Sequence, residues 1–303
     1  ILVACSTLHK QWFLTRAGVF NNKIVRAILH SFHMMPVYRF RDGVKGLRNN
    51  DTTIRQSIDL LKEQQSILVF GEGDQSMRYR LRVMQKGFAR IALAAQEEND
   101  WKLPLYIVPV GVQYDHFYNF RSRVLISYGE AIPIDASLKS LSEREFYDTL
   151  LDKTRKGLLP QMVHIESDNY KEIENYLHAN RNKKDLVEQL RYDQEVVKAW
   201  DGNPTKIPAK PKNNFLLVTT LPLHIYVWIN NFAPYFLIKY LLDKYVTPEF
   251  RGSLKVGFAM VIVPFFYLVQ SLIVQTIFSD WRITLGYVFT LPFLSIWSVD
   301  LFK

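Results

Sequence analysis

Cysteine is almost missing from this sequence, since Cys5 is the only one among 303 residues. A single thiol excludes a disulfide bond within the chain, and it excludes any metal site built from several cysteines. Such scarcity also fits a reducing compartment. The sequence therefore predicts a fold that is not cross-linked internally.

Charged residues are absent from three stretches near the end of the chain, 215–238, 257–278 and 283–299. A helix needs about 20 apolar residues to cross the hydrocarbon core of a bilayer, so the second stretch predicts a membrane helix and the third a shorter one. The first stretch predicts either a full span or two half-helices that enter and leave on the same side, with paired asparagines at the turn. The residues that interrupt it are Pro222, His224, Asn230, Asn231 and Pro234.

Acidic residues are outnumbered by basic ones, and the formal net charge is +9. Most of this excess lies before residue 215. A basic surface of this kind suits anionic lipid headgroups and also nucleic acid. Within 135–200, however, acidic residues interleave with Lys183, Lys184 and Arg191, which favours a solvated face over a phosphate-tracking one. We therefore expect no nucleic-acid partner.

The stretch 67–90 carries the clearest chemical signal. An apolar run, a glycine turn and a helix start form a common platform for anions, because backbone N–H groups converge where the strand ends. Alternate residues of an extended segment point the same way, so two arginines could bind one phosphate. The pattern predicts a phosphate site, and a solvated basic hairpin beside a core strand is the alternative. The residues in question are Gly71, Glu72, Gly73, Arg78, Arg80, Arg82 and Lys86.

This stretch and its surroundings resemble the glycerolipid phosphate acyltransferases. The residues that carry the resemblance are MPVYR at 35–39, FGEGDQS at 70–76 followed by Leu81-Arg82 and Lys86-Gly87, and IVPV at 107–110. These blocks occur in the order that the family shows. Two positions depart from the family pattern, because Gly71 stands where a proline is usual and Gln75 where many members have an arginine.

The resemblance implies an α/β fold, a layered acyltransferase domain over 1–134 with a mixed, mostly parallel sheet flanked by helices. Apolar periodicity places helices between strands in the same region, which is typical of this class. A helical extension over 135–200, a linker over 201–214 and a membrane region over 215–303 with two or three hydrophobic segments would follow. The expected strands are 11–15, 36–40, 67–70, 105–112 and 124–128, and the expected helices are 21–32, 52–63 and one that begins near residue 86.

By the same resemblance, arginines would hold the phosphate of the substrate and the glycine loop would be shaped around it. Arg39, with Arg41 as its near alternative, would act beside Arg80 and Arg82. Glu72 and Gly73 would shape the loop, and Lys86 at the helix start would be a further anion partner. No metal and no organic cofactor is implied.

The general base of the family, a histidine followed four or five residues later by an aspartate, is not found among these blocks. The family places that pair just before the helix that leads to the second block. We therefore expect it upstream of Ile1, and we expect residues 1–303 alone to be inactive. His164 has Asp168 four residues later, but it lies far from the blocks and is interpreted as part of a surface pair.

The resemblance implies a glycerophosphate O-acyltransferase of phospholipid biosynthesis. The enzyme would move a fatty acyl group from acyl-CoA or acyl carrier protein to a hydroxyl of glycerol-3-phosphate or lysophosphatidic acid. It would be an integral membrane protein with its catalytic domain on the cytoplasmic face, because basic residues in 201–214 and 239–256 favour that side. The competing hypothesis is a non-catalytic, membrane-anchored module that binds anionic lipid or nucleic acid with the same arginines.

Overall fold

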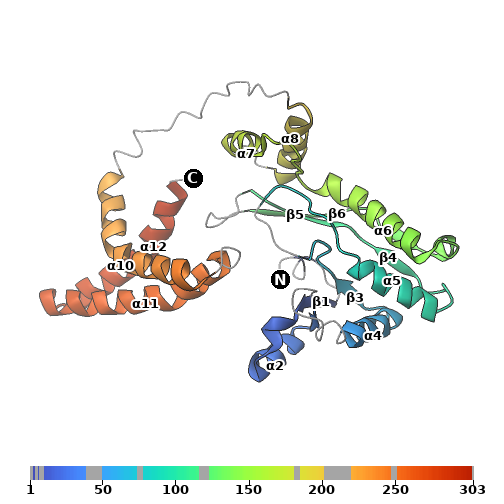
Figure 1. Ribbon diagram of the computed structural model, residues 1–303. Coiled ribbons are helices and arrows are strands. Elements are labelled where there is room, and N and C mark those ends of the chain that lie inside the picture. The colour runs from blue at the N-terminus through green and yellow to red at the C-terminus, as the bar shows by residue number, and fades with distance from the viewer. Residues whose placement is uncertain are drawn as a thin grey trace. The chain divides into compact units, whose positions relative to one another are not determined.

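The computed structural model describes residues 3, 6, 10–38, 50–73, 78–115, 123–180, 185–200, 220–246 and 251–301 (Figure 1). The chain divides into two compact units, which are described separately below. The first unit comprises Ile1–Phe117 and Ser122–Thr205, and the second consists mainly of Lys206–Lys303.

The first unit opens with a parallel sheet of three strands. Strand β1 (Gln11–Arg16) lies between β2 (Met34–Val37) and β3 (Ser66–Leu68). Phe13 is in register with Met34 on one side and with Leu68 on the other. Helix α2 (Lys23–Ser31) and the 3₁₀ turn η1 (Ala17–Phe20) connect β1 to β2, and α4 (Asn50–Lys62) connects β2 to β3. The predicted alternation of strands and helices is confirmed, although β2 begins and ends earlier than expected.

The sequence predicted one strand over the apolar run 105–112, and this prediction is wrong. The run forms β4 (Leu105–Ile107) and β5 (Val110–Tyr114), which pair antiparallel with β7 (Ile132–Ile134) and β6 (Val124–Tyr128) respectively. The break falls at Pro109, which has no N–H to donate to a ladder. One face of this region is open, because Tyr106 and Val108 are 58% and 45% exposed. The single mixed sheet is therefore replaced by three small sheets among the described residues.

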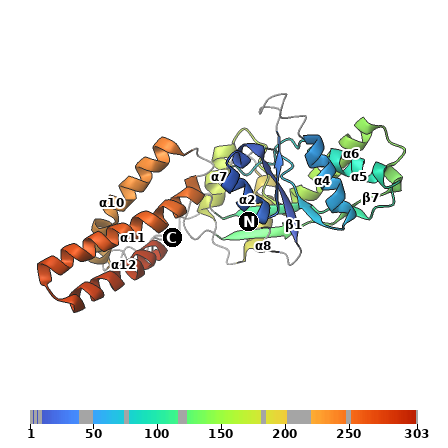
Figure 2. The ribbon, with the colours of Figure 1, turned by 90° about the horizontal axis from the view of Figure 1, so that it is seen from below.

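Helices α5 (Gly87–Glu98) and α6 (Glu143–Leu158) form the main hydrophobic core with the β4–β7 pair. Figure 2 shows α4, α5 and α6 side by side. A capping box starts α6, because the Ser142 side chain accepts the Glu145 N–H and the Glu145 carboxylate accepts the Ser142 N–H in return. The 3₁₀ turn η3 (Ala136–Leu138) precedes α6 and η4 (Leu159–Gln161) follows it. The buried core residues are Ala89, Ala92, Leu93, Ile134, Leu138, Phe146, Tyr147 and Leu150.

A second core joins α7 (Tyr170–Ala179) and α8 (Leu186–Lys198) to the basic stretch. Tyr79, which lies between Arg78 and Arg80, is only 2% exposed in this core. Its carbonyl accepts the Ile165 N–H at 2.8 Å. The helical part and the predicted phosphate site are therefore packed into one unit.

Over its described residues, 220–246 and 251–301, the second unit forms α10 (Leu221–Tyr245), α11 (Arg251–Phe278) and α12 (Trp281–Leu301). Among the described helices, α11 is the one long and apolar enough to cross a membrane, over Leu254–Phe278 with a mean hydropathy of 2.1. None of this apolar window is buried against other parts of the protein. This agrees with the membrane helix predicted over 257–278, and 283–299 is helical as part of α12.

The pair of half-helices considered for 215–238 is wrong for its described part, because α10 runs without a break through both asparagines. The Asn230 and Asn231 side chains bond to the carbonyls of Tyr226 and Val227, one turn earlier in the same helix. Pro234 lacks the N–H that would bond to the Asn230 carbonyl. That carbonyl instead accepts Gln270 Nε2 of α11 at 2.8 Å. A side chain of the neighbouring helix thus satisfies the carbonyl that Pro234 leaves without its usual helical donor.

The hydrogen bond from Gln270 to the Asn230 carbonyl should stabilise the protein more when residue 234 is proline than when it is a residue with an N–H. Gln270→Leu should lower the free energy of unfolding by about 1 kcal/mol, because an apolar interior offers the freed carbonyl no other partner. In a Pro234→Ala background the restored N–H can bond to that carbonyl, so the same substitution should cost less. Thermal unfolding of the detergent-solubilised protein, followed by circular dichroism, measures both. Equal costs in the two backgrounds would contradict this account.

Candidate active site

The glycine loop lies at the carboxyl end of β3. In the strand order β2-β1-β3 the chain runs from β1 to one neighbour and then crosses to the other. Ligands of parallel α/β sheets bind where the order reverses in this way, outside the carboxyl ends of the strands. The loop 70–73 follows β3 at that edge, so the fold places the predicted site where a ligand is expected.

Gly73 closes the turn in a conformation that other residues adopt at a cost. Its φ is +65°, and its N–H donates to the Phe70 carbonyl at 3.1 Å. A Cβ at this position would lie 2.9 Å from Cγ of Gln85. Gln85 in turn donates its N–H to the Gly71 carbonyl at 2.7 Å. The loop is therefore closed against the residue that precedes Lys86, and Gly73 makes that approach possible.

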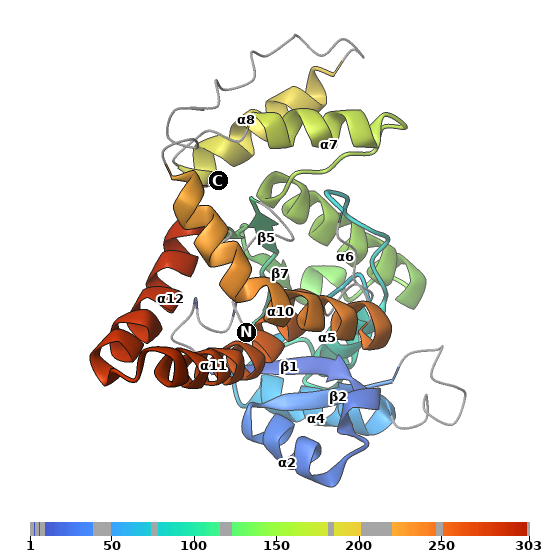
Figure 3. The ribbon, with the colours of Figure 1, turned by 90° about the vertical axis from the view of Figure 1, so that its left-hand side faces the viewer.

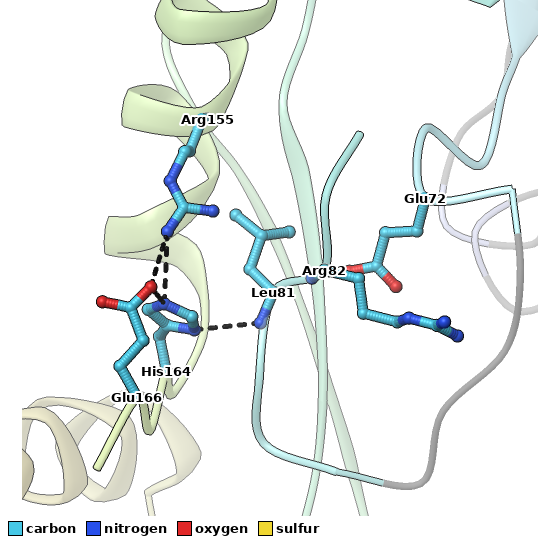
Figure 4. Close-up of polar contacts among 6 residues, drawn as sticks. All are labelled: Glu72, Leu81, Arg82, Arg155, His164 and Glu166. Atoms are coloured by element: carbon cyan, nitrogen blue, oxygen red, sulfur yellow. Dashed lines mark hydrogen bonds and ion pairs between the residues drawn. The ribbon is translucent and has the colours of Figure 1, made fainter. Parts of the chain in front are cut away.

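Glu72 connects the loop to the basic segment. Its Oε1 accepts the backbone N–H of Arg82 at 3.1 Å. Figure 4 shows the Arg82 side chain on the same side of the segment as Glu72, directed away from Arg155 and Glu166. The carboxylate of Glu72 thus holds the segment by its main chain, and its role in shaping the loop around a ligand stays a prediction.

Residues 78–82 lie in no strand, and the backbone bends at Arg78 and Tyr79. Tyr79 and Leu81 are buried, whereas Arg78 and Arg80 are exposed and Arg82 is half-buried, so the predicted alternation is present. Side chains from distant parts of the chain hold the backbone in place. The hydroxyl of Tyr170 accepts the Tyr79 N–H at 2.8 Å, and Nδ1 of His164 accepts the Leu81 N–H at 2.9 Å. The sequence offered no local signal for these two partners.

Both ring nitrogens of His164 are engaged. Because Nδ1 accepts the Leu81 N–H, the proton of the neutral ring is on Nε2, which lies 3.2 Å from Oε1 of Glu166 (Figure 4). Nη2 of Arg155 lies 3.0 Å from the same carboxylate oxygen. His164 therefore positions the segment and has no nitrogen free to act as a general base. The carboxylate beside His164 is that of Glu166, two residues later in the chain. The sequence had suggested Asp168 as the partner of His164.

The cations of the segment have different surroundings. The Arg78 guanidinium lies 5.8 Å from the centre of the Tyr170 ring, and the charge of Arg80 acts on Glu166.

Two groups around the segment have shifted pKa values. The pKa of Glu166 is lowered mainly by the hydrogen bond from His164, and the charges of Arg155 and Arg80 also lower it. Burial raises the pKa of the Tyr170 hydroxyl to about 12, so it stays protonated as it accepts the Tyr79 N–H and donates to Glu174.

A cleft of about 430 Å³ adjoins the loop and the basic segment. This volume falls within the range typical of small-molecule sites. Most of the lining is apolar and comes from β3, α5, β4 and β5. The charged lining residues are Glu72, Arg78 and Arg80. The structure therefore combines an apolar cavity with a charged rim, and the apolar part had not been predicted from the basic stretch.

The remaining candidate phosphate-binding residues do not line the cleft or lie outside the described residues. Arg82 and Lys86 are not among the residues that line the cleft. The Lys86 ammonium lies 3.8 Å from Oδ1 of Asp148 and 5.6 Å from the centre of the Tyr147 ring, both on α6. Arg39, its alternative Arg41 and residues 74–76 lie outside the described residues, so their roles stay predictions. The described part of the chain contains no cluster of three or more His, Cys, Asp or Glu side chains suited to a metal ion.

Comparisons with known proteins agree with the part of the chain that forms this site. Residues 1–113 match the family model described as Acyltransferase. Over 113 residues the chain is 32% identical to glycerol-3-phosphate O-acyltransferase 2 of Saccharomyces cerevisiae. The aligned region covers 36% of this chain. Over 118 residues the chain is 30% identical to glycerol-3-phosphate O-acyltransferase 1 of the same yeast, covering 37% of the chain. The aligned part spans only 15% of each yeast protein. No solved structure matches the chain.

The geometry of the loop predicts that its two glycines respond differently to an added methyl group. Gly73→Ala should lower the free energy of unfolding by about 1–2 kcal/mol, because a left-handed backbone conformation strains any residue with a Cβ. Gly71→Ala is the matched control, since its Cβ would lie 3.6 Å from Sδ of Met84, an ordinary contact. Denaturant unfolding of both variants measures the difference. A loss at Gly71 as large as that at Gly73 would contradict the assigned role of the turn.

Proposed function

We propose that this protein transfers a fatty acyl group to a hydroxyl of a phosphorylated glycerol, because residues 1–113 match the family model described as Acyltransferase. The acceptor is glycerol-3-phosphate or lysophosphatidic acid, and the donor is acyl-CoA or acyl carrier protein. The two yeast relatives are glycerol-3-phosphate O-acyltransferases, which supports glycerol-3-phosphate as the acceptor. The reaction belongs to phospholipid biosynthesis.

The observation that carries this proposal is the apolar cleft with arginines at its rim. An acyl chain is stabilised by leaving water for apolar walls, at about 0.8 kcal/mol for each buried CH₂ group. A phosphate requires fixed cations or backbone N–H donors. Arg78 and Arg80 line the same cleft as the apolar residues of α5 and β5. One cavity thus offers apolar walls for an acyl chain and cations for a phosphate.

In this proposal Arg39, Arg80 and Arg82 bind the phosphate, and Glu72 and Gly73 fix the loop beside them. Lys86 remains a further candidate that would have to leave Asp148 to reach an anion. The geometry adds Arg78 to the list, because it lines the cleft. Glu72 accepts a main-chain N–H from Arg82 and so holds the backbone from which that guanidinium extends.

The acceptor hydroxyl must lose its proton as it attacks the thioester carbonyl. In the resembling family a histidine takes this proton and an aspartate orients the ring. His164 does not suit that role, since one nitrogen accepts the Leu81 N–H and the other faces Glu166. The described residues of this site therefore bind and position, and the base is assigned to none of the described histidines.

We also propose that α11 anchors the protein in a membrane and that the first unit works on the cytoplasmic face. Membrane association is supported by the length and apolar composition of Leu254–Phe278. The product of the reaction belongs in a bilayer, whereas the donor thioester is soluble. The basic residues between 239 and 256 favour the cytoplasmic side.

Removal of the Arg82 side chain should weaken binding of the phosphorylated acceptor in particular. A hydrogen bond to a charged group contributes about 1.5–3 kcal/mol, so Arg82→Ala should raise the Kd for glycerol-3-phosphate about tenfold or more. Titration calorimetry with glycerol-3-phosphate and with acyl-CoA measures this without turnover. Arg144→Ala is the matched control, because this arginine on α6 has a side chain that is 89% exposed. Equal weakening for acceptor and donor would count against the phosphate assignment.

A bulky side chain in the cleft should shorten the acyl chain that the protein accepts. Val112 on β5 lines the cleft, so Val112→Trp should weaken binding of long acyl-CoA substrates while shorter ones and glycerol-3-phosphate bind as before. A series of acyl-CoA molecules of increasing length, titrated by fluorescence, provides the measurement. Val187→Trp on α8 makes the same change at an exposed position away from the cleft. The same length preference in both variants would show that the cleft does not hold the acyl chain.

A further inference from the structure

The polar residues Arg26 and His30 of helix α2 are exposed, yet each contacts Phe20 of the 3₁₀ turn η1. Arg26 donates from Nε to the carbonyl of Phe20 at 3.0 Å, and the His30 ring lies 5.6 Å from the Phe20 ring. Phe20 itself is 4% exposed and belongs to the interior. Figure 3 shows α2 beside β2, with which it is in contact. A surface helix normally buries its apolar stripe, but α2 buries no residue, and Leu29 is its one half-buried side chain.

The apolar side of α2 faces outward. No residue of the helix is buried, although Ile24 and Ile28 lie one turn apart and Val25 and Phe32 lie on the same side. These side chains are exposed by 73%, 50%, 40% and 61% respectively. Val19, just before the helix, is 43% exposed. A contiguous apolar patch of this kind marks an interaction surface more often than a single exposed residue does.

The charge around this apolar face has one sign. Residues 10–38 contain Lys10, Arg16, Lys23 and Arg26 and not a single Asp or Glu. Arg16, Lys23 and Arg26 are exposed. Because the carboxylates that balance the arginines and lysines elsewhere in the first unit are missing here, the segment forms a local positive field. An apolar helix face within a cationic segment complements a surface with negative headgroups above an apolar interior.

We propose that α2 docks on an anionic phospholipid bilayer, with Ile24, Val25, Ile28 and Phe32 inserted at the level of the upper acyl chains. The Asn22 side chain, which accepts the Ile24 and Val25 N–H groups, fixes the start of the helix. Lys23 and Arg16 supply the electrostatic attraction near that end. The inference goes beyond acyl transfer, because it concerns lipid contact by a helix whose residues do not line the cleft.

The test places a fluorescent label on α2 in the full chain. Because Cys5 is the only cysteine, Cys5→Ser gives a background in which Ile28→Cys can be labelled uniquely, with Ile24→Cys as a second position. Gln56→Cys, exposed on α4, is the matched control. The labelled proteins are placed in nanodiscs of phosphatidylcholine alone or of phosphatidylcholine with phosphatidylserine. Nitroxide-bearing lipids then quench any label that enters the bilayer.

We expect several-fold stronger quenching at position 28 than at position 56, and a further increase when phosphatidylserine is present. Lys23→Glu should remove most of that increase and leave the circular dichroism spectrum unchanged, because Lys23 lies on a helix without buried residues. Equal quenching at positions 28 and 56 would overturn the proposal. A label at position 28 that responds to protein concentration but not to lipid would assign the face to a second copy of the chain, which would also overturn it.

Discussion

The site depends on how the backbone of residues 79–82 is held. This segment belongs to no strand, so its main-chain groups have no ladder partners, and buried main-chain groups must be paired elsewhere. Tyr170 and His164 accept the N–H groups of Tyr79 and Leu81, and Glu72 accepts that of Arg82. These contacts fix the direction in which the intervening arginines point. The basic stretch is positioned by side chains that lie up to 91 residues away in sequence.

This arrangement also sets what each titratable group can do. A histidine whose Nδ1 accepts an amide proton keeps its remaining proton on Nε2, and in His164 that proton faces Glu166. The low pKa of Glu166 follows mainly from that hydrogen bond, with Arg155 and Arg80 adding to it. The ionised carboxylate of Glu166 therefore pairs with Arg155 on α6. Arg80, which contributes only through its charge, lines the cleft together with Glu72 and Arg78.

Much of the first unit could be predicted from the sequence. Helical periodicity predicted the helices of the region 1–134, because that signal arises from contacts within one or two turns. The antiparallel pairs could not be predicted, since the partners of β4 and β5 are distant in sequence or depend on the path of the chain between the strands. Only the structure showed that the apolar run divides at Pro109 into two strands. In α10, Pro234 and the asparagines suggested a break, but the structure has one helix there, and Gln270 of another helix satisfies the Asn230 carbonyl.

The sequence by itself determined the alternation of strands and helices, the glycine turn before three arginines at alternate positions, and the apolar length of α11. These features depend on residue type and spacing along the chain. Only the tertiary structure decided that Tyr170 and His164 hold the basic segment, that a cleft lies beneath Arg78 and Arg80, and that α2 turns its apolar side outward. Those outcomes depend on which distant surfaces meet, because hydrogen bonds and burial act over a few ångströms in space, whatever the separation in sequence.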